Sequence, residues 1–245
     1  MYYKTNWALV VPLANESSDF VTFTSRVIEV LDRLESGTVY FIVDHVSKDN
    51  TLDLCNALSG KDQRFVTVWS PENKNIVDAY LKGYRVAHEQ GHDFIIEMDA
   101  GLSHDPRAIP MFLRVLNEGN ECAFGCRFMN GGSIWDSSFK RTFISKTGTY
   151  LSNFLLGTSY DDMTSGFQGF HASVVDEILK FKLHSKAHFY QTELRYLLRR
   201  KRYIEVPIHY RAPSPSISKK AITNSISVLL YYFFRRIMFK PSHSI

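Results

Sequence analysis

An acidic side chain that ends an apolar run is the strongest candidate for chemistry in this chain of 245 residues. The apolar run covers residues 94–98, Asp99 follows it directly, and Pro106 then opens a predicted helix. A carboxylate at the carboxyl end of a buried strand lies where open α/β sheets bind their ligands. It can hold a divalent cation and, through that cation, a diphosphate. The alternative is a strand-end Asp that only caps a turn.

Short apolar runs that read as strands alternate with amphipathic runs that read as helices. Such alternation predicts an α/β fold with right-handed crossovers and a mostly parallel sheet flanked by helices. We expect strands at 8–13, 39–43, 65–69, 93–98, 123–126 and 203–208, and helices at 19–34, 50–58, 76–88, 106–116, 145–156, 174–181 and 191–198. Residues 160–170 and 212–218 read as loops, and Pro207 indicates that the last strand lies at an edge of the sheet or that the proline lies near the end of the strand.

Composition excludes several classes of protein. With 44% hydrophobic and 22% charged residues, the chain is neither disordered nor a disulfide scaffold. Its three cysteines lack zinc-type spacing, and we expect buried thiols in a reducing cytoplasm. The apolar run at 8–13 is too short for a signal peptide. From Arg195 onward eleven Lys or Arg face one acid, Glu205, but no nucleic-acid motif accompanies them.

Residues 219–245 predict a basic amphipathic helix. Its uncharged stretch, 221–234, is shorter than the roughly 20 residues that a spanning helix needs. We expect an interfacial helix on a membrane surface, while packing on the sheet or on a second subunit is the alternative. One helical face carries the apolar residues Ile222, Ile226, Leu229, Phe233 and Ile237, and the flanking cations are Lys219, Lys220, Arg235 and Arg236.

Several short sequences lie in a characteristic order along the chain. They are Pro12-Leu-Ala-Asn15-Glu16, Asp44 after the second strand, Met98-Asp-Ala-Gly-Leu-Ser-His-Asp-Pro106, Gly125-Cys-Arg127 with Gly131-Gly132, and Thr164-Ser-Gly-Phe167. In this order the chain resembles family 2 glycosyltransferases of the GT-A fold, a Rossmann-like sheet, from about Ala8 to Lys219. Within that family it resembles the dolichol-phosphate mannose synthase branch, the polyprenyl-phosphate glycosyltransferases. The resemblance implies a glycosyltransferase domain at 1–218, followed by the helix at 219–245.

The resemblance also implies a role for each matching residue. Pro12, Asn15 and Glu16 match the loop for the nucleotide base and ribose, and Asp44 matches the acid that holds the base. Asp99 matches the metal ligand. The cations that would serve the diphosphate and the acceptor phosphate are Arg127, Arg141 and Lys219.

The chain departs from the family pattern in two places. His45 replaces a second acid after Asp44, and Gly101 replaces the second acid of the Asp-X-Asp motif. Mg²⁺ or Mn²⁺ remains the expected cofactor, because Mg²⁺ is commonly held by one or two carboxylates plus substrate phosphates. Asp105 followed by Pro106 reads as a helix cap and not as a further ligand.

The implied reaction is an inverting transfer of a sugar from a nucleotide-diphosphate sugar to a polyprenyl phosphate. Such an enzyme would lie peripherally on the cytoplasmic membrane face, and a homo-oligomer is left open. One alternative is a glycosyltransferase that uses a hydroxyl acceptor in envelope polysaccharide synthesis, with Asp161 or Asp162 as the base that a hydroxyl needs. The other is a degenerate nucleotide-sugar-binding module without activity.

Overall fold

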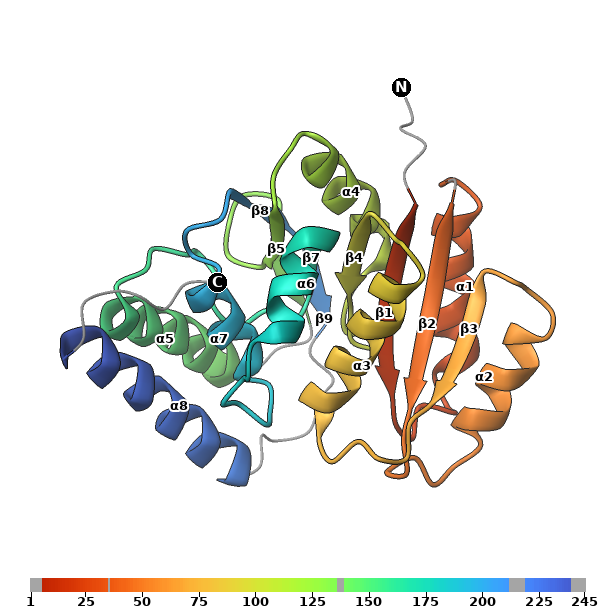
Figure 1. Ribbon diagram of the computed structural model, residues 1–245, viewed down its shortest axis with the longest axis horizontal. Coiled ribbons are helices and arrows are strands. Elements are labelled where there is room, and N and C mark those ends of the chain that lie inside the picture. The colour runs from red at the N-terminus through yellow and green to blue at the C-terminus, as the bar shows by residue number, and fades with distance from the viewer. Residues whose placement is uncertain (1–5, 35, 136–138, 212–218, 239–245) are drawn as a thin grey trace.

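A twisted sheet of seven strands forms the centre of the molecule (Figure 1). The structure is a computed structural model that describes residues 6–34, 36–135, 139–211 and 219–238, without the side chains of 139–141. The strand order is β3-β2-β1-β4-β7-β5-β8. The bounds are β1 Trp7–Leu13, β2 Gly37–Val43, β3 Phe65–Trp69, β4 Phe94–Glu97, β5 Cys122–Cys126, β7 Gln168–His171 and β8 Tyr203–Pro207.

Helices cover both faces of this sheet, which confirms the predicted α/β fold. One face packs against α1 (Phe20–Leu31), α2 (Thr51–Ser59), the 3₁₀ turn η1 (Pro106–Ala108) and α4 (Ile109–Asn117). The other packs against α3 (Ile76–Glu89), α6 (Ala172–Lys180) and α7 (Tyr190–Leu197), and α8 (Lys219–Met238) adds buried side chains to the same cluster. Helix α5 (Phe139–Leu156) lies beside α8 (Figure 1).

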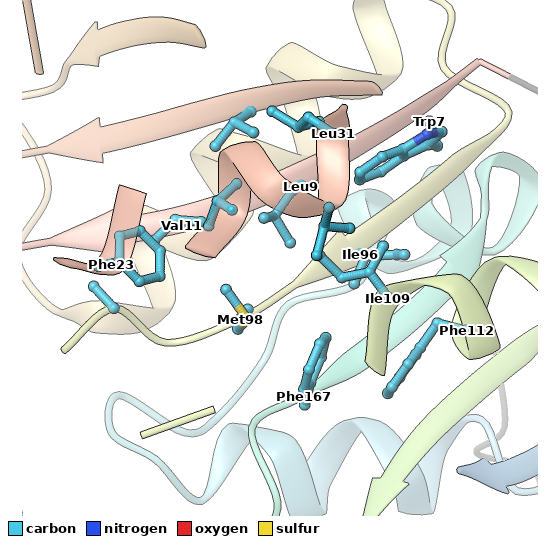
Figure 2. Close-up of a cluster of buried hydrophobic side chains, with 14 of the residues drawn as sticks. Trp7, Leu9, Val11, Phe23, Leu31, Ile96, Met98, Ile109, Phe112 and Phe167 are labelled. Atoms are coloured by element: carbon cyan, nitrogen blue, oxygen red, sulfur yellow. The ribbon is translucent and has the colours of Figure 1, made fainter. Parts of the chain in front are cut away.

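Strand β1 shows why the first strands read as continuous apolar runs. Trp7, Leu9 and Val11 enter the cluster on the α1 face, seen in Figure 2. Ala8 and Val10 enter the cluster on the α3 face. Successive side chains of a strand point to opposite faces, so a strand covered on both sides must be apolar at every position.

The prediction of a loop at 160–170 was wrong at its end. Strand β7 runs antiparallel between β4 and β5, and the two flanking strands supply its ladder. Its sequence, Gln168-Gly-Phe-His171, lacks the alternation that identifies a strand, because burial and pairing with neighbours decide its state. The small parallel pair of β6 (Ser133–Trp135) and β9 (His209–Arg211) was also not predicted. The edge position of β8 is confirmed.

The expected thiol state is also confirmed: all three cysteines are free and buried. Within the ranges that the structure describes, we find no helix whose length and apolar character would let it cross a membrane. The predicted loop at 212–218 lies outside the described residues.

Candidate functional site

Asp99 lies two residues after the end of β4, on the side of the sheet where the parallel strands have their carboxyl ends. Its side chain is 32% exposed, so a ligand can reach it. The buried Tyr80 of α3 donates a hydrogen bond from its hydroxyl to Asp99 Oδ1 at 2.5 Å. The Thr164–Phe167 loop closes on the other side, where a Cβ atom on Gly166 would lie 3.2 Å from Asp99 Oδ2. Tyr80 and this loop therefore fix the carboxylate at the site.

A buried carboxylate, that of Glu97, lies two residues before Asp99, at the end of β4. Glu97 accepts hydrogen bonds from the hydroxyls of Tyr84 and Tyr190 and from the amide of Gln168. Burial raises the pKa of Glu97 to about 7, although these donors favour the ionised form. Gln168 in turn accepts from the fully buried Arg195 at 3.0 Å. This network joins α3, β4, β7 and α7 beneath the site.

The loops after β1 and β2 lie next to Asp99, at the same carboxyl ends of the parallel strands. The Asn15 side chain accepts from the Lys48 amide at 2.8 Å and donates to the Val46 carbonyl at 3.2 Å. Asp44 accepts from the Val46 amide at 2.9 Å, so the turn cap engages one of its two oxygens. Pro12 is buried within β1, opposite Ile42. The structure thus brings the predicted nucleotide loop and Asp44 together, and their contact with a nucleotide stays a prediction.

Arg127 follows β5 but does not project freely into the site. Its Nε and Nη2 donate to the two oxygens of Asp162 at 2.7 and 2.8 Å, and Nη2 also donates to Thr164. Both partners of this bidentate pair are buried. Burial opposes ionisation of Asp162, yet the hydrogen bonds and charge of Arg127 outweigh it and lower the pKa of this carboxyl. Arg127 is a fixed charge beneath the site, and its action on a phosphate stays a prediction.

Arg141 and Lys219 lie in the first turns of α5 and α8. The Arg141 side chain lies outside the described residues, and Lys219 is exposed. Arg236, near the end of α8, donates to the Leu155 carbonyl at 2.9 Å, at the end of α5. The two helices therefore end together, which places both first turns at the opposite end of the pair (Figure 1).

The expected apolar stripe of the tail is partly wrong. Leu229 is buried with Val228 and Tyr232 in the core on the α3 face, and Phe233 is half-buried. The Tyr232 hydroxyl donates to Glu193 at 2.7 Å. The helix therefore packs on the domain through one face. The exposed apolar side chains of α8 are Ile222, Ile226, Leu230, Phe234, Ile237 and Met238.

The residues around Asp99 fit a divalent cation of the Mg²⁺ or Mn²⁺ type only in part. Carboxylate oxygens are the ligands that such hard cations prefer. Among the described residues, however, no three His, Cys, Asp or Glu side chains converge in a cation site. Asp105 is a cap, as expected: it accepts from the Arg107 amide at 3.0 Å. Any cation here needs oxygens from a ligand or from water.

Sequence reasoning missed the residues that support Asp99 from below. Tyr80 and Tyr190 lie on helices as ordinary amphipathic residues, and nothing in their spacing marks them. Glu97 offered one signal, because it is the only acid inside the apolar run 94–98. His104 also went unassigned, although it is 2% exposed and lies behind Asp99.

Comparison with known proteins agrees with this geometry. The model of glycosyl transferase family 2 matches residues 8–179, well over half of the chain. The chain belongs to glycosyl transferase family 2. It is therefore a glycosyltransferase, and its sheet with the acidic strand end is the GT-A fold.

Curated relatives of this glycosyltransferase include polyprenyl-phosphate enzymes. The polyprenol monophosphomannose synthase of Mycolicibacterium smegmatis is 27% identical over 219 residues, covering 88% of this chain and 81% of that protein. The undecaprenyl-phosphate mannosyltransferase of Micrococcus luteus is 27% identical over 203 residues, 82% of each chain. The dolichol-phosphate mannosyltransferase of Pyrococcus furiosus is 28% identical over 173 residues, 70% of this chain and 47% of that protein.

A solved structure supports the fold. Glucosyl-3-phosphoglycerate synthase of Mycobacterium tuberculosis, solved with Mn²⁺, UDP and phosphoglyceric acid, superposes with a TM-score of 0.68. The match covers 94% of this chain and 78% of that chain at 14% identity. At this identity the likeness concerns the fold alone.

Because Gly166 is tightly packed against Asp99 and Gln191, we expect a side chain at this position to lower both stability and turnover. In Gly166→Ala, the added methyl group would lie 2.3 Å from the Gln191 amide nitrogen as well as close to Asp99. We expect about 1–3 kcal/mol loss in the free energy of unfolding, as overpacking gives, and a larger relative loss of turnover. Gly148→Ala is the control, since its nearest neighbour lies at 3.9 Å. Equal turnover in both variants would contradict the positioning role of this loop.

The buried ion pair with Arg127 predicts that Asp162 stabilises the fold and is not a catalytic base. Asp162→Asn leaves Arg127 buried with a neutral partner, and we expect the free energy of unfolding in urea to fall by about 3–5 kcal/mol. The exposed neighbour provides the matched control: Asp161→Asn should change it by less than about 0.5 kcal/mol. An Asp162→Asn protein of normal stability that has lost turnover would instead identify Asp162 as a catalytic base.

Proposed function

We propose that this glycosyltransferase moves a sugar from a nucleotide-diphosphate sugar to a polyprenyl phosphate, with inversion at the anomeric carbon. The relatives named above support this acceptor. The observation that carries the proposal is the buried pair of Arg127 and Asp162. A hydroxyl acceptor would need Asp161 or Asp162 as its base, and the ion pair with Arg127 engages the carboxylate of Asp162. A phosphate acceptor needs no base.

The proposed reaction requires positioning and charge neutralisation and no proton transfer. An oxygen of the acceptor phosphate forms a bond to the anomeric carbon while the bond from that carbon to the diphosphate oxygen breaks. The electron pair of the broken bond leaves with the diphosphate. Because the acceptor is already an anion near neutral pH, alignment and electrostatic stabilisation supply the catalysis. Attack opposite the leaving group inverts the configuration.

The chain's own residues divide this task. Asp99, held by Tyr80, is the proposed ligand of a divalent cation, and such a cation, when bound, neutralises the leaving diphosphate. The loops of Asn15 and Asp44 lie where the nucleoside would bind. Arg141 and Lys219 begin α5 and α8, and helix N-termini favour anions. We assign these two cations to the acceptor phosphate.

The proposed acceptor lies in a membrane, so the enzyme needs a face that binds the membrane surface. The pair of α5 and α8 has such a face. Both helices expose apolar side chains on the outside of the molecule, and they lie side by side (Figure 1). Amphipathic helices with flanking cations bind in the interface of anionic bilayers. We propose that the protein binds through these helices to a membrane surface, as a peripheral protein of the cytoplasmic face. Besides the residues of α8 given above, the exposed apolar side chains of α5 are Phe143, Ile144, Tyr150, Leu151 and Phe154.

Product extraction tests this function. The enzyme is incubated with undecaprenyl phosphate and a panel of labelled UDP- and GDP-sugars, with Mn²⁺ or Mg²⁺ present. We expect label to pass into the organic phase for at least one donor. Asp99→Asn should lower the rate by about a hundredfold or more, because loss of one electrostatic contact in a transition state has this scale. A near-normal rate for Asp99→Asn would contradict the role of this residue.

Charged substitutions on the exposed face of α8 test the membrane contact. Truncation before α8 would also remove its buried residues, so point changes are the sharper test. The pair Ile226→Glu and Phe234→Glu, each 53% exposed, should weaken binding to anionic vesicles about tenfold or more. Val21→Glu on α1, 67% exposed, is the control. Equal flotation of both proteins with vesicles would show that this face binds no membrane.

A further inference from the structure

A second carboxylate lies at the place where the chain lacks one. A Cβ atom on Gly101 would lie 3.0 Å from Glu16 Oε2 and 3.5 Å from Oε1. Glu16 belongs to the loop after β1, and Asp99 follows β4, the neighbouring strand. The acid that the Asp-X-Asp motif would supply at Gly101 is thus absent, and the carboxylate of Glu16 fills the space beside it.

The surroundings of Glu16 are acidic. The carboxylates of Asp19, Asp49 and Asp99 all lie close enough to Glu16 to interact with its charge. Within the described part of the chain, Glu16 forms no ion pair, and no donor hydrogen-bonds its carboxylate. Neighbouring carboxylates that no Lys or Arg neutralises attract a counter-ion, and hard divalent cations bind such oxygen ligands.

A buried histidine points independently to a ligand at this place. His104 is 2% exposed, and neither ring nitrogen has a hydrogen-bond partner among the described residues. Its Nδ1 lies 3.8 Å from Asp99 Oδ2, too far for a hydrogen bond. An unsatisfied buried polar group costs about 1–3 kcal/mol, and an ion or water that completes the site is a common explanation. The orphaned nitrogen faces the carboxylate that would bind the ion.

We propose that Glu16 is the second carboxylate ligand of a divalent cation at Asp99, in place of the acid missing at Gly101. This inference rests on the proposed donor site and changes the role of Glu16 from a nucleotide contact to a metal ligand. Two carboxylates from neighbouring strand ends, completed by diphosphate oxygens and water, suit Mg²⁺ or Mn²⁺.

Binding of Mn²⁺ alone tests the proposal without turnover. Electron paramagnetic resonance measures free Mn²⁺ during titration of the protein in the absence of nucleotide. We expect Glu16→Gln and Asp99→Asn each to raise the dissociation constant about tenfold or more, because each removes one charged ligand. Glu89→Gln, an exposed acid on α3, is the matched control and should stay within about twofold of the unsubstituted protein.

A double substitution tests whether the acid can move between the two positions. Gly101 has a φ of 74°, a left-handed conformation that Asp tolerates better than most residues. In the Glu16→Gln/Gly101→Asp protein, the carboxylate returns to the position of the Asp-X-Asp motif while Glu16 no longer opposes it. We expect Mn²⁺ affinity to recover to within about threefold of the unsubstituted protein.

The outcomes separate this proposal from the proposed function. Unchanged Mn²⁺ affinity in Glu16→Gln, with a loss in Asp99→Asn, would overturn the role of Glu16 and leave glycosyl transfer intact. Unchanged affinity in both would overturn the cation site itself. Circular dichroism of each variant shows whether a loss of affinity comes from unfolding, and recovery in the double variant excludes that explanation.

Discussion

The hydrogen bonds of one buried carboxylate, Glu97, hold together the elements that carry the site. This acid ends β4, and its three donors come from α3, α7 and β7. A buried carboxylate without partners would cost several kcal/mol, so the donors must stay in place as long as the chain is folded. Asp99 emerges two residues later, and its own partner, Tyr80, stacks on Tyr190 with ring centroids 5.2 Å apart. The position of Asp99 thus depends on the network beneath it.

Close backbone approach between β7 and its neighbours is the second condition for this arrangement. The Gly125 amide donates to the Phe167 carbonyl at 2.7 Å, and a Cβ atom on Gly125 would lie 2.8 Å from that carbonyl oxygen. Arg195 completes the contact by donating to the carbonyls of Ser165 and Gly125. The buried guanidinium of Arg195 therefore anchors the loop that faces Asp99 from below.

The sequence predicted the parts of the structure that local pattern decides. Apolar runs and helical spacing located the parallel strands and their helices, and the strand-end position of Asp99 followed from them. Pattern could not identify β7, because its pairing comes from strands distant in the chain. It also could not show that Arg127 is held by Asp162, or that Glu16 reaches the space at Gly101. These contacts join different loops, so only the folded arrangement reveals them.

The proposed acceptor is already an anion and needs no catalytic base. The most direct test is a comparison of two acceptors of equal chain length, polyprenyl phosphate and polyprenol, in the same detergent micelles. Transfer to the phosphate should exceed transfer to the alcohol by about a thousandfold or more, since the alcohol would need a base of the kind that contributes 10²–10⁴-fold in enzymes. Equal or faster transfer to the alcohol would contradict the account and favour a hydroxyl acceptor.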